Sequence, residues 1–77
     1  MTVLERAQLR QLGVQIRLMR QERGLTQAEL ARQAGMKPGP VNAIEKGRSL
    51  PSTGVLLRLA RVMEVPVSRV FDGAGSA

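Results

Sequence analysis

The 77-residue sequence has no cysteine, histidine, tyrosine or tryptophan, and Phe71 is its only aromatic residue. Without cysteine and histidine, disulfides are impossible, and the usual zinc sites and nucleophile–base pairs lack their common members. One phenylalanine is too little for the stacked aromatic platforms that bind single-stranded nucleic acid. Because only one aspartate is present and histidine is absent, little acid–base chemistry is available near neutral pH. We therefore expect no catalytic residue, no metal and no cofactor, which argues against an enzyme.

Long apolar runs are missing as well. No stretch approaches the ~20 residues that cross a bilayer, and the N-terminus lacks the charged-then-apolar pattern of a signal peptide. The absence of disulfides fits a reducing compartment, so we expect a cytoplasmic protein without a membrane partner. The length corresponds to one domain. We place this domain at residues 1–72 and expect the small-residue tail, 73–77, to be disordered.

Positive charge is what the sequence has in excess. Twelve Lys and Arg residues against six Asp and Glu residues give a net charge of +6. Basic domains of this size commonly bind nucleic acid or another polyanion. The alternative is an ordinary solvated surface in an arginine-rich proteome, since ten of the twelve cations are Arg. Charge alone leaves both interpretations open.

Apolar residues recur at helical spacing along the whole chain, without strand-like alternation or internal repeats. This pattern predicts an all-α fold of five helices, over about 4–22, 27–34, 38–46, 53–64 and 67–71. The stripes predicted to form the core in the first and fourth helices are Leu9, Leu12, Ile16, Met19, Leu56, Leu59, Ala60 and Met63.

The second helix has the clearest start signal. Thr26 stands at the cap position, and Glu29, three residues later, completes a capping box. Gly35 then suits the left-handed residue that ends a helix. A short helix with well-defined ends is therefore predicted between Thr26 and Gly35.

The third helix begins unusually, with proline, glycine and proline at 38–40. Proline is tolerated in a first turn because the first amide groups have no intrahelical partner. The helix can therefore begin at Pro38 with Lys37 as its cap, or at Pro40 with Gly39 as its cap.

Two short helices joined by a glycine turn form a helix-turn-helix, here over about 26–46. Five segments continue the pattern in a familiar order and spacing: LTQAELARQAG, NAIEKG, LPS, LLRLARVMEV and VSRVF. Through these segments, from about Leu12 to Phe71, the sequence resembles the Cro/repressor-type helix-turn-helix family. The resemblance implies a compact, phage-repressor-like transcriptional regulator that binds specific double-stranded DNA. It further implies a homodimer on a palindromic operator, with the second motif helix, about 38–46, in the major groove.

Several side chains match DNA-backbone or structural positions of that family. Arg20 and Glu45 match a partly buried ion pair between the first and third helices, for which a structural role is favoured over DNA contact. The phosphate contacts that we expect are Gln27, Lys46, Arg48 and Arg17. A solvated charged face is the interpretation for some of the remaining arginines, first of all Arg6, Arg58 and Arg61.

Groove-facing positions of the family fall on Lys37, Pro38, Gly39, Asn42 and Ala43. Three of these five side chains can neither donate nor accept a hydrogen bond. Asn42 could pair with adenine, and Lys37 with guanine or a phosphate. Specificity should therefore be modest per base, or be carried by DNA shape. The alternative is that 38–40 simply ends a turn and that the domain binds a protein.

Two sets of apolar residues lie outside the core stripes. On the fourth helix, Val55 and Val62 lie about 90° from the centre of the stripe and could join Val67 on one surface. Since Val55, Val67 and Arg69 match family positions at the dimer contact, we expect the dimer interface at Val55, Val62, Val67 and Arg69.

The second set lies on the first helix, within about 60° of arc opposite its core face. Its members are Val3, Ala7, Val14 and Leu18. A helix that is apolar on two opposite sides usually has a second partner, although scattered surface apolar residues are common. A protein partner on this stripe is the alternative function, in which the chain is an antitoxin-like or adaptor module.

Overall fold

The computed structural model describes residues 2–71, so the predicted tail over 73–77 lies outside the described part of the chain. The elements are α1 (Val3–Glu22), α2 (Gln27–Gln33), α3 (Pro38–Glu45), α4 (Thr53–Met63) and the 3₁₀ helix η1 (Val67–Phe71). Residues 2–71 contain no strand. The fold is all-α as predicted, with four α-helices and a 3₁₀ helix in place of five α-helices.

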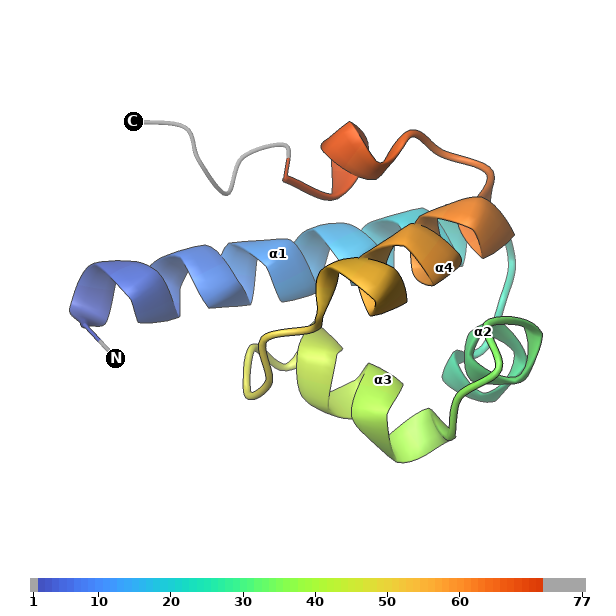
Figure 1. Cartoon of the computed structure of the whole chain (residues 1–77), viewed down its shortest axis with the longest axis horizontal. Coiled ribbons are helices and arrows are strands. Elements are labelled where there is room, and N and C mark those ends of the chain that lie inside the picture. The colour runs from blue at the N-terminus through green and yellow to red at the C-terminus, as the bar shows by residue number, and fades with distance from the viewer. Residues whose placement is uncertain (1, 72–77) are drawn as a thin grey trace.

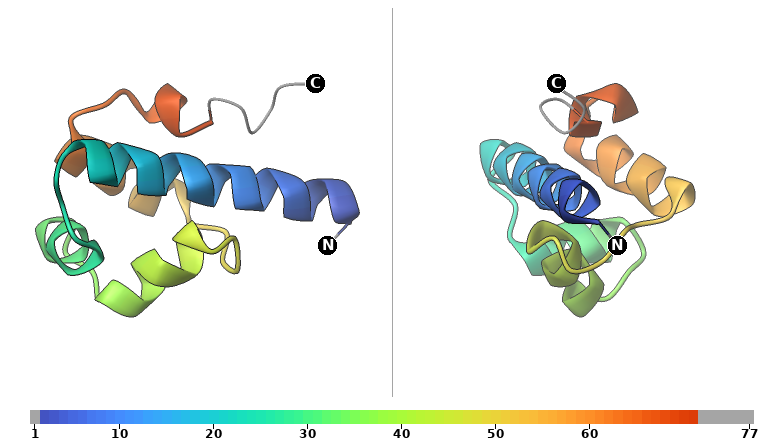
Figure 2. Two further views of the ribbon diagram at one scale, coloured as in Figure 1. Left: turned by 180° about the vertical axis from the view of Figure 1, so that it is seen from behind. Right: turned by 90° about the vertical axis from the view of Figure 1, so that its left-hand side faces the viewer.

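α1 sets the length of the molecule. At about 1.5 Å per residue, its 20 residues account for most of the longest dimension, 32 Å. Its C-terminal half lies along α4 and above α3, whereas its N-terminal end projects past both (Figures 1 and 2). Within residues 2–71, no helix combines the length and apolar character that crossing a bilayer requires.

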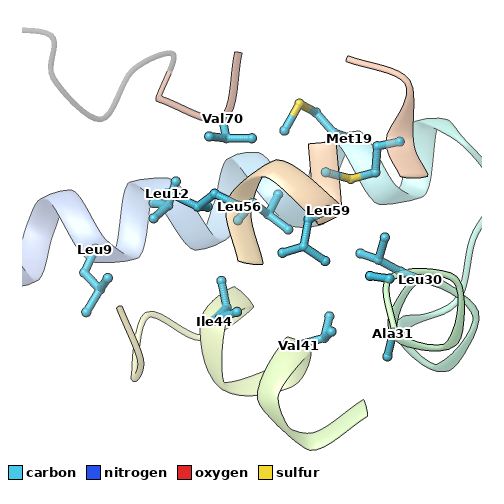
Figure 3. Packing of buried hydrophobic residues seen from close by; sticks show 13 residues of the cluster. Leu9, Leu12, Met19, Leu30, Ala31, Val41, Ile44, Leu56, Leu59 and Val70 are labelled. Atoms are coloured by element: carbon cyan, nitrogen blue, oxygen red, sulfur yellow. The ribbon is translucent and has the colours of Figure 1, made fainter. Parts of the chain in front are cut away.

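All five elements contribute to one core (Figure 3). The stripes predicted on α1 and α4 are buried, and Leu30, Val41 and Val70 complete the core from α2, α3 and η1. Two small residues, Ala31 and Ala34, are also buried in and after α2. Because these side chains are short, the neighbouring helices can approach α2 closely.

The end of α4 differs by one residue from the prediction. The helix stops at Met63, and Glu64 takes the left-handed conformation at φ 57°. Arg23, at the end of α1, donates from Nη2 to the Glu64 carbonyl at 3.1 Å and pairs with its carboxylate at 3.7 Å. These contacts join the ends of α1 and α4 and help to hold a conformation that non-glycine residues seldom adopt.

Gly13, in the middle of α1, sets how closely α3 approaches. A Cβ at this position would lie 2.6 Å from the Glu45 carbonyl oxygen and still closer to that of Ile44. Glycine inside a helix costs roughly 0.5–1 kcal/mol relative to alanine. The close contact between α1 and the last turn of α3 explains why glycine is nevertheless present.

Candidate nucleic-acid interface

The start of α2 is fixed by its own side chains. The Thr26 hydroxyl accepts from the Glu29 N–H at 3.0 Å, and the Glu29 carboxylate accepts from the Thr26 N–H at 3.0 Å. The predicted capping box is thus confirmed. The Thr26 backbone N–H, and after it the Thr26 hydroxyl, favour the charged carboxylate and lower the pKa of Glu29 below its usual 4.5. Gly35, at φ 71°, turns the chain towards α3.

α3 begins with Lys37 as its cap and Pro38 as its first residue, which selects the first of the two predicted starts. No side chain accepts a hydrogen bond at this cap. Residues 37 to 40 are exposed, and apart from its two chain neighbours a Cβ on Gly39 would meet nothing within 4 Å. The first turn of α3 therefore forms a bare outer surface, and the helix packs against the core through Val41 and Ile44.

The predicted groove-facing residues divide into two groups. Lys37, Pro38 and Gly39 are exposed, whereas Asn42 and Ala43, one turn later, are half-buried. Only Lys37 and Asn42 carry polar side chains, and the Lys37 side chain is exposed to solvent. Among the five groove-facing residues, these two side chains are therefore the only ones that can form hydrogen bonds with DNA.

The ion pair between α1 and α3 is formed by Arg20 and Glu45. Arg20 donates from Nε to Glu45 Oε2 at 2.7 Å and from Nη2 to Oε1 at 3.0 Å. Its Nη1 donates to the Leu25 carbonyl at 2.8 Å. The Glu45 side chain is only 2% exposed, so this two-point pair is buried and holds α3 against α1 and the start of α2.

Two amide side chains extend this pair into the helix-turn-helix. Gln27 donates from Nε2 to Glu45 Oε1 at 3.0 Å, and Asn42 donates from Nδ2 to Gln27 Oε1 at 3.1 Å. From the sequence we predicted that both residues contact DNA, and we did not predict these hydrogen bonds within the protein. One signal was available, because Asn42 and Glu45 are three residues apart and so share a helix face.

The cations expected at phosphates, Arg17, Lys46 and Arg48, are all exposed. A further cation, Arg10, lies against the same loop: its Cγ is 2.8 Å from the position that a Cβ on Gly47 would occupy. Arg10 precedes Arg17 by seven residues, which puts both on nearly the same face of α1. This spacing was visible in the sequence and would have indicated Arg10.

The two apolar sets differ in exposure. Val55, Val62 and Val67 are half-buried and pack against the core, and Arg69 is exposed. On α1, Val14 is 37%, Leu18 is 45% and Val3 is 83% exposed, while Ala7 is half-buried. Further exposed apolar side chains, at positions for which we predicted no interface, are Leu50, Leu57 and Phe71.

The geometry of α2, the glycine turn and α3 defines a helix-turn-helix protein. Residues 11–70 match the family described as helix-turn-helix domain. The chain belongs to this family.

Individual relatives agree with this assignment. The chain is 41% identical over 54 residues to multiprotein-bridging factor 1 of Candida albicans, covering 70% of this chain and 36% of that protein. It is 33% identical over 64 residues to the HTH-type transcriptional repressor RghR of Bacillus subtilis, covering 82% and 47%. The chain thus spans less than half the length of either relative.

The fold is also close to that of a solved regulator. The restriction-modification controller protein C.AhdI of Aeromonas hydrophila superposes with a TM-score of 0.80 at 28% identity. The match covers 82% of this chain and 96% of the controller. Most of this chain therefore shares its fold with this controller protein.

Proposed function

We propose that this chain is a transcriptional regulator that binds specific double-stranded DNA as a homodimer on a palindromic operator, with α3 in the major groove. The observation that carries the proposal is the form of α3. Its first turn, 38–40, is exposed and featureless, whereas its opposite side is buried and anchored through Glu45. A helix held from behind, with its N-terminal turn outward, is what major-groove docking requires.

Exposed cations flank both ends of α3. Lys37 stands before α3, and Lys46 and Arg48 follow it. Gln27 begins α2 and keeps one hydrogen on Nε2 after donating to Glu45. We assign phosphate contacts to Gln27, Lys46, Arg48 and Arg17, and add Arg10 because it packs on the same loop.

The dimer is assigned to the edge of α4 and to η1. Val55, Val62 and Val67 are only half-buried within one chain, so a second copy can cover the rest of their apolar surface. Arg69 is exposed on η1 and belongs to the rim of this interface. Val67→Glu should convert the dimer into a folded monomer with much lower affinity for a palindromic site. Sedimentation that finds an unchanged dimer would contradict this location.

DNA binding is tested through its salt dependence. A dimer that neutralises about six phosphates should lose affinity with a log–log slope near −5. Lys46→Ala should weaken binding to all duplexes about equally and reduce the slope, because phosphate contacts carry no base information. Arg58→Ala, on the outer side of α4, is the matched control and should leave both quantities unchanged. A flat response to salt would contradict the proposal.

A second candidate function is an adaptor that binds another protein on α1. It is favoured by the exposure of Val3, Val14 and Leu18 on a helix that projects from the rest of the molecule. One relative is also named as a bridging factor for several proteins. If a partner protein co-purifies with the unmodified chain but not with Leu18→Gln, and DNA binding shows no salt dependence, the adaptor becomes the better explanation.

A further inference from the structure

We propose that Glu45 fixes the orientation of the Asn42 amide through Gln27, so that Asn42 presents its oxygen to the major groove and selects a base with an exposed amino group. Asn42 is the specificity-determining residue in this proposal, and Gln27 is its positioning residue. The base preference rests on the proposed DNA-binding function, whereas the fixed orientation does not.

The first step is the immobility of Glu45. Its carboxylate can only accept hydrogen bonds, and Arg20 holds both of its oxygens, at 2.7 and 3.0 Å. With a side chain that is 2% exposed, the carboxylate has no water-filled space into which to turn. The Glu45 carboxylate is therefore a fixed hydrogen-bond acceptor for Gln27.

The second step is the orientation of Gln27. The nitrogen and oxygen of a side-chain amide have nearly the same shape, and their partners decide which is which. The Gln27 atom that faces Glu45 Oε1 lies 3.0 Å away. If it were the oxygen, two acceptors would face each other at this distance next to a buried charge. Gln27 must therefore direct its nitrogen to Glu45 and its oxygen to Asn42.

The same argument applies once more at Asn42. The Asn42 atom that faces Gln27 Oε1 lies 3.1 Å away, and it must be a donor because Gln27 has been fixed. Asn42 Nδ2 thus points to Gln27, and Oδ1 occupies the other branch of the amide. The carboxylate of Glu45 sets the direction of two successive amides that would otherwise be free to flip.

The consequence for recognition follows from the chemistry of the bases. In the major groove adenine and cytosine present amino groups, whereas guanine and thymine present oxygen acceptors to an approaching group. An outward oxygen accepts from adenine N6 or cytosine N4. The second hydrogen of Nδ2 can add adenine N7. We expect adenine first, cytosine second, and guanine or thymine last at one base pair per half-site.

The orientation is tested without DNA by comparing Asn42→Asp with Asn42→Ala. Aspartate has the same shape but cannot donate to Gln27 when charged, so it places a carboxylate against a fixed oxygen. The net charge of +6 favours an added negative charge overall, and repulsion from Glu45, three residues away on the same helix face, accounts for only a small part of the expected difference. We expect the aspartate variant to melt about 5 °C or more below the alanine variant at neutral pH.

The pH dependence of this difference gives a second readout. The substituted carboxyl should have a raised pKa, because only its protonated form can donate to Gln27. Its destabilisation should therefore shrink relative to Asn42→Ala as the pH falls through that pKa. Thermal melting of both variants over acidic to neutral pH measures it. An aspartate variant at least as stable as the alanine variant at neutral pH would overturn the fixed orientation.

The base preference is tested with Gln27→Met, which keeps the side-chain length and removes the amide. Duplexes selected from random sequences should show the preference for adenine or cytosine in the unmodified protein. In the variant this preference should weaken about fivefold or more, about the lower limit for one specific base contact. Loss of affinity with an unchanged base preference would overturn the role of Gln27, and a preference for guanine or thymine would overturn the outward oxygen. If the unmodified protein selects no duplex, the proposed function fails while the melting comparison still decides the orientation.

Discussion

α2 and α3 have 7 and 8 residues, yet they begin in opposite ways. α2 opens with a complete capping box between Thr26 and Glu29. α3 opens at Lys37 without any side-chain cap, and its first turn contains two prolines and a glycine. The comparison teaches that a short helix can be fixed from either end. α2 is held at its start by its own side chains, and α3 is held at its end by Glu45 and the contact with Gly13.

The largest expected effect comes from removing the anchor of α3. Glu45→Gln leaves the largely buried guanidinium of Arg20, whose side chain is 11% exposed, without its counter-charge, which we expect to cost about 3 kcal/mol. Urea unfolding measures the loss. The matched control is Glu64→Gln, which removes an exposed carboxylate that faces Arg23, and which should cost about 0–1 kcal/mol. Equal losses in both variants would show that α3 does not depend on this anchor.

The next effect compares the two ends of α3 through glycine-to-alanine substitutions, one in contact with its last turn and one in its first turn. Gly13→Ala places a methyl group against the carbonyls of Ile44 and Glu45, and the forced shift should cost about 1–3 kcal/mol. Gly39→Ala meets nothing within 4 Å apart from its chain neighbours, so it removes a flexible helical glycine. Because residue 39 precedes Pro40, the new Cβ is also restricted by the proline ring, and we expect a net change of less than about 0.5 kcal/mol. Melting temperatures of the pair measure the contrast. Equal losses in the two variants would refute it.

Removing the cap of α2 and adding one to α3 should change the stability of the protein in opposite directions. Thr26→Ala should destabilise by about 1 kcal/mol, because the Glu29 N–H loses its acceptor. Lys37→Ser supplies an acceptor that only the Gly39 N–H can use, because Pro40 has no N–H, so it should stabilise by less, about 0.5 kcal/mol. Thermal unfolding compares them. Lys37→Ser should also weaken DNA binding, since it removes a cation beside the groove-facing turn.

The smallest effect is the pH dependence of the α2 cap. The pKa of Glu29 is lowered in the folded state, so its contribution is present above the unfolded pKa and disappears as the pH falls through the folded value. Glu29→Gln should therefore be less stable than the unmodified protein at neutral pH, with the gap closing in acid. A gap that stays constant from neutral to acidic pH would contradict the lowered pKa.

The local features of the fold could be predicted from the sequence. The capping box at Thr26 and the turn at Gly35 each depend on residues within a few positions of one another, whereas the sequence left the start of α3 open between Pro38 and Pro40. The apolar stripes of α1 and α4 were also predictable, since helical spacing alone places them on one face. Glu64, which ends α4 one residue early, was missed because a left-handed glutamate has no local signal.

The hydrogen bonds that join Asn42, Gln27 and Glu45 could not be predicted in the same way. Asn42 and Gln27 are 15 residues apart, and Gln27 and Glu45 are 18 apart, so their contacts depend on how α2 and α3 cross. The same applies to Gly13, whose close contact with α3 exists only in the folded molecule. Which cations touch phosphate and which valines meet a second copy remain predictions, because both depend on partners outside a single chain.

The projecting end of α1 has a consequence for anything joined to it. If a helical segment is fused ahead of α1 without a break, the helix fixes both the distance of that segment and its rotation about the helix axis. Each residue added or removed ahead of Val3 would turn an attached helical segment by about 100° and move it by about 1.5 Å. Insertions of one, two and three residues would therefore rotate such a segment around the helix axis in steps of about 100°. In a rigid helical fusion to α1, the number of linking residues alone would therefore set the direction of the fused segment relative to the surface of α3.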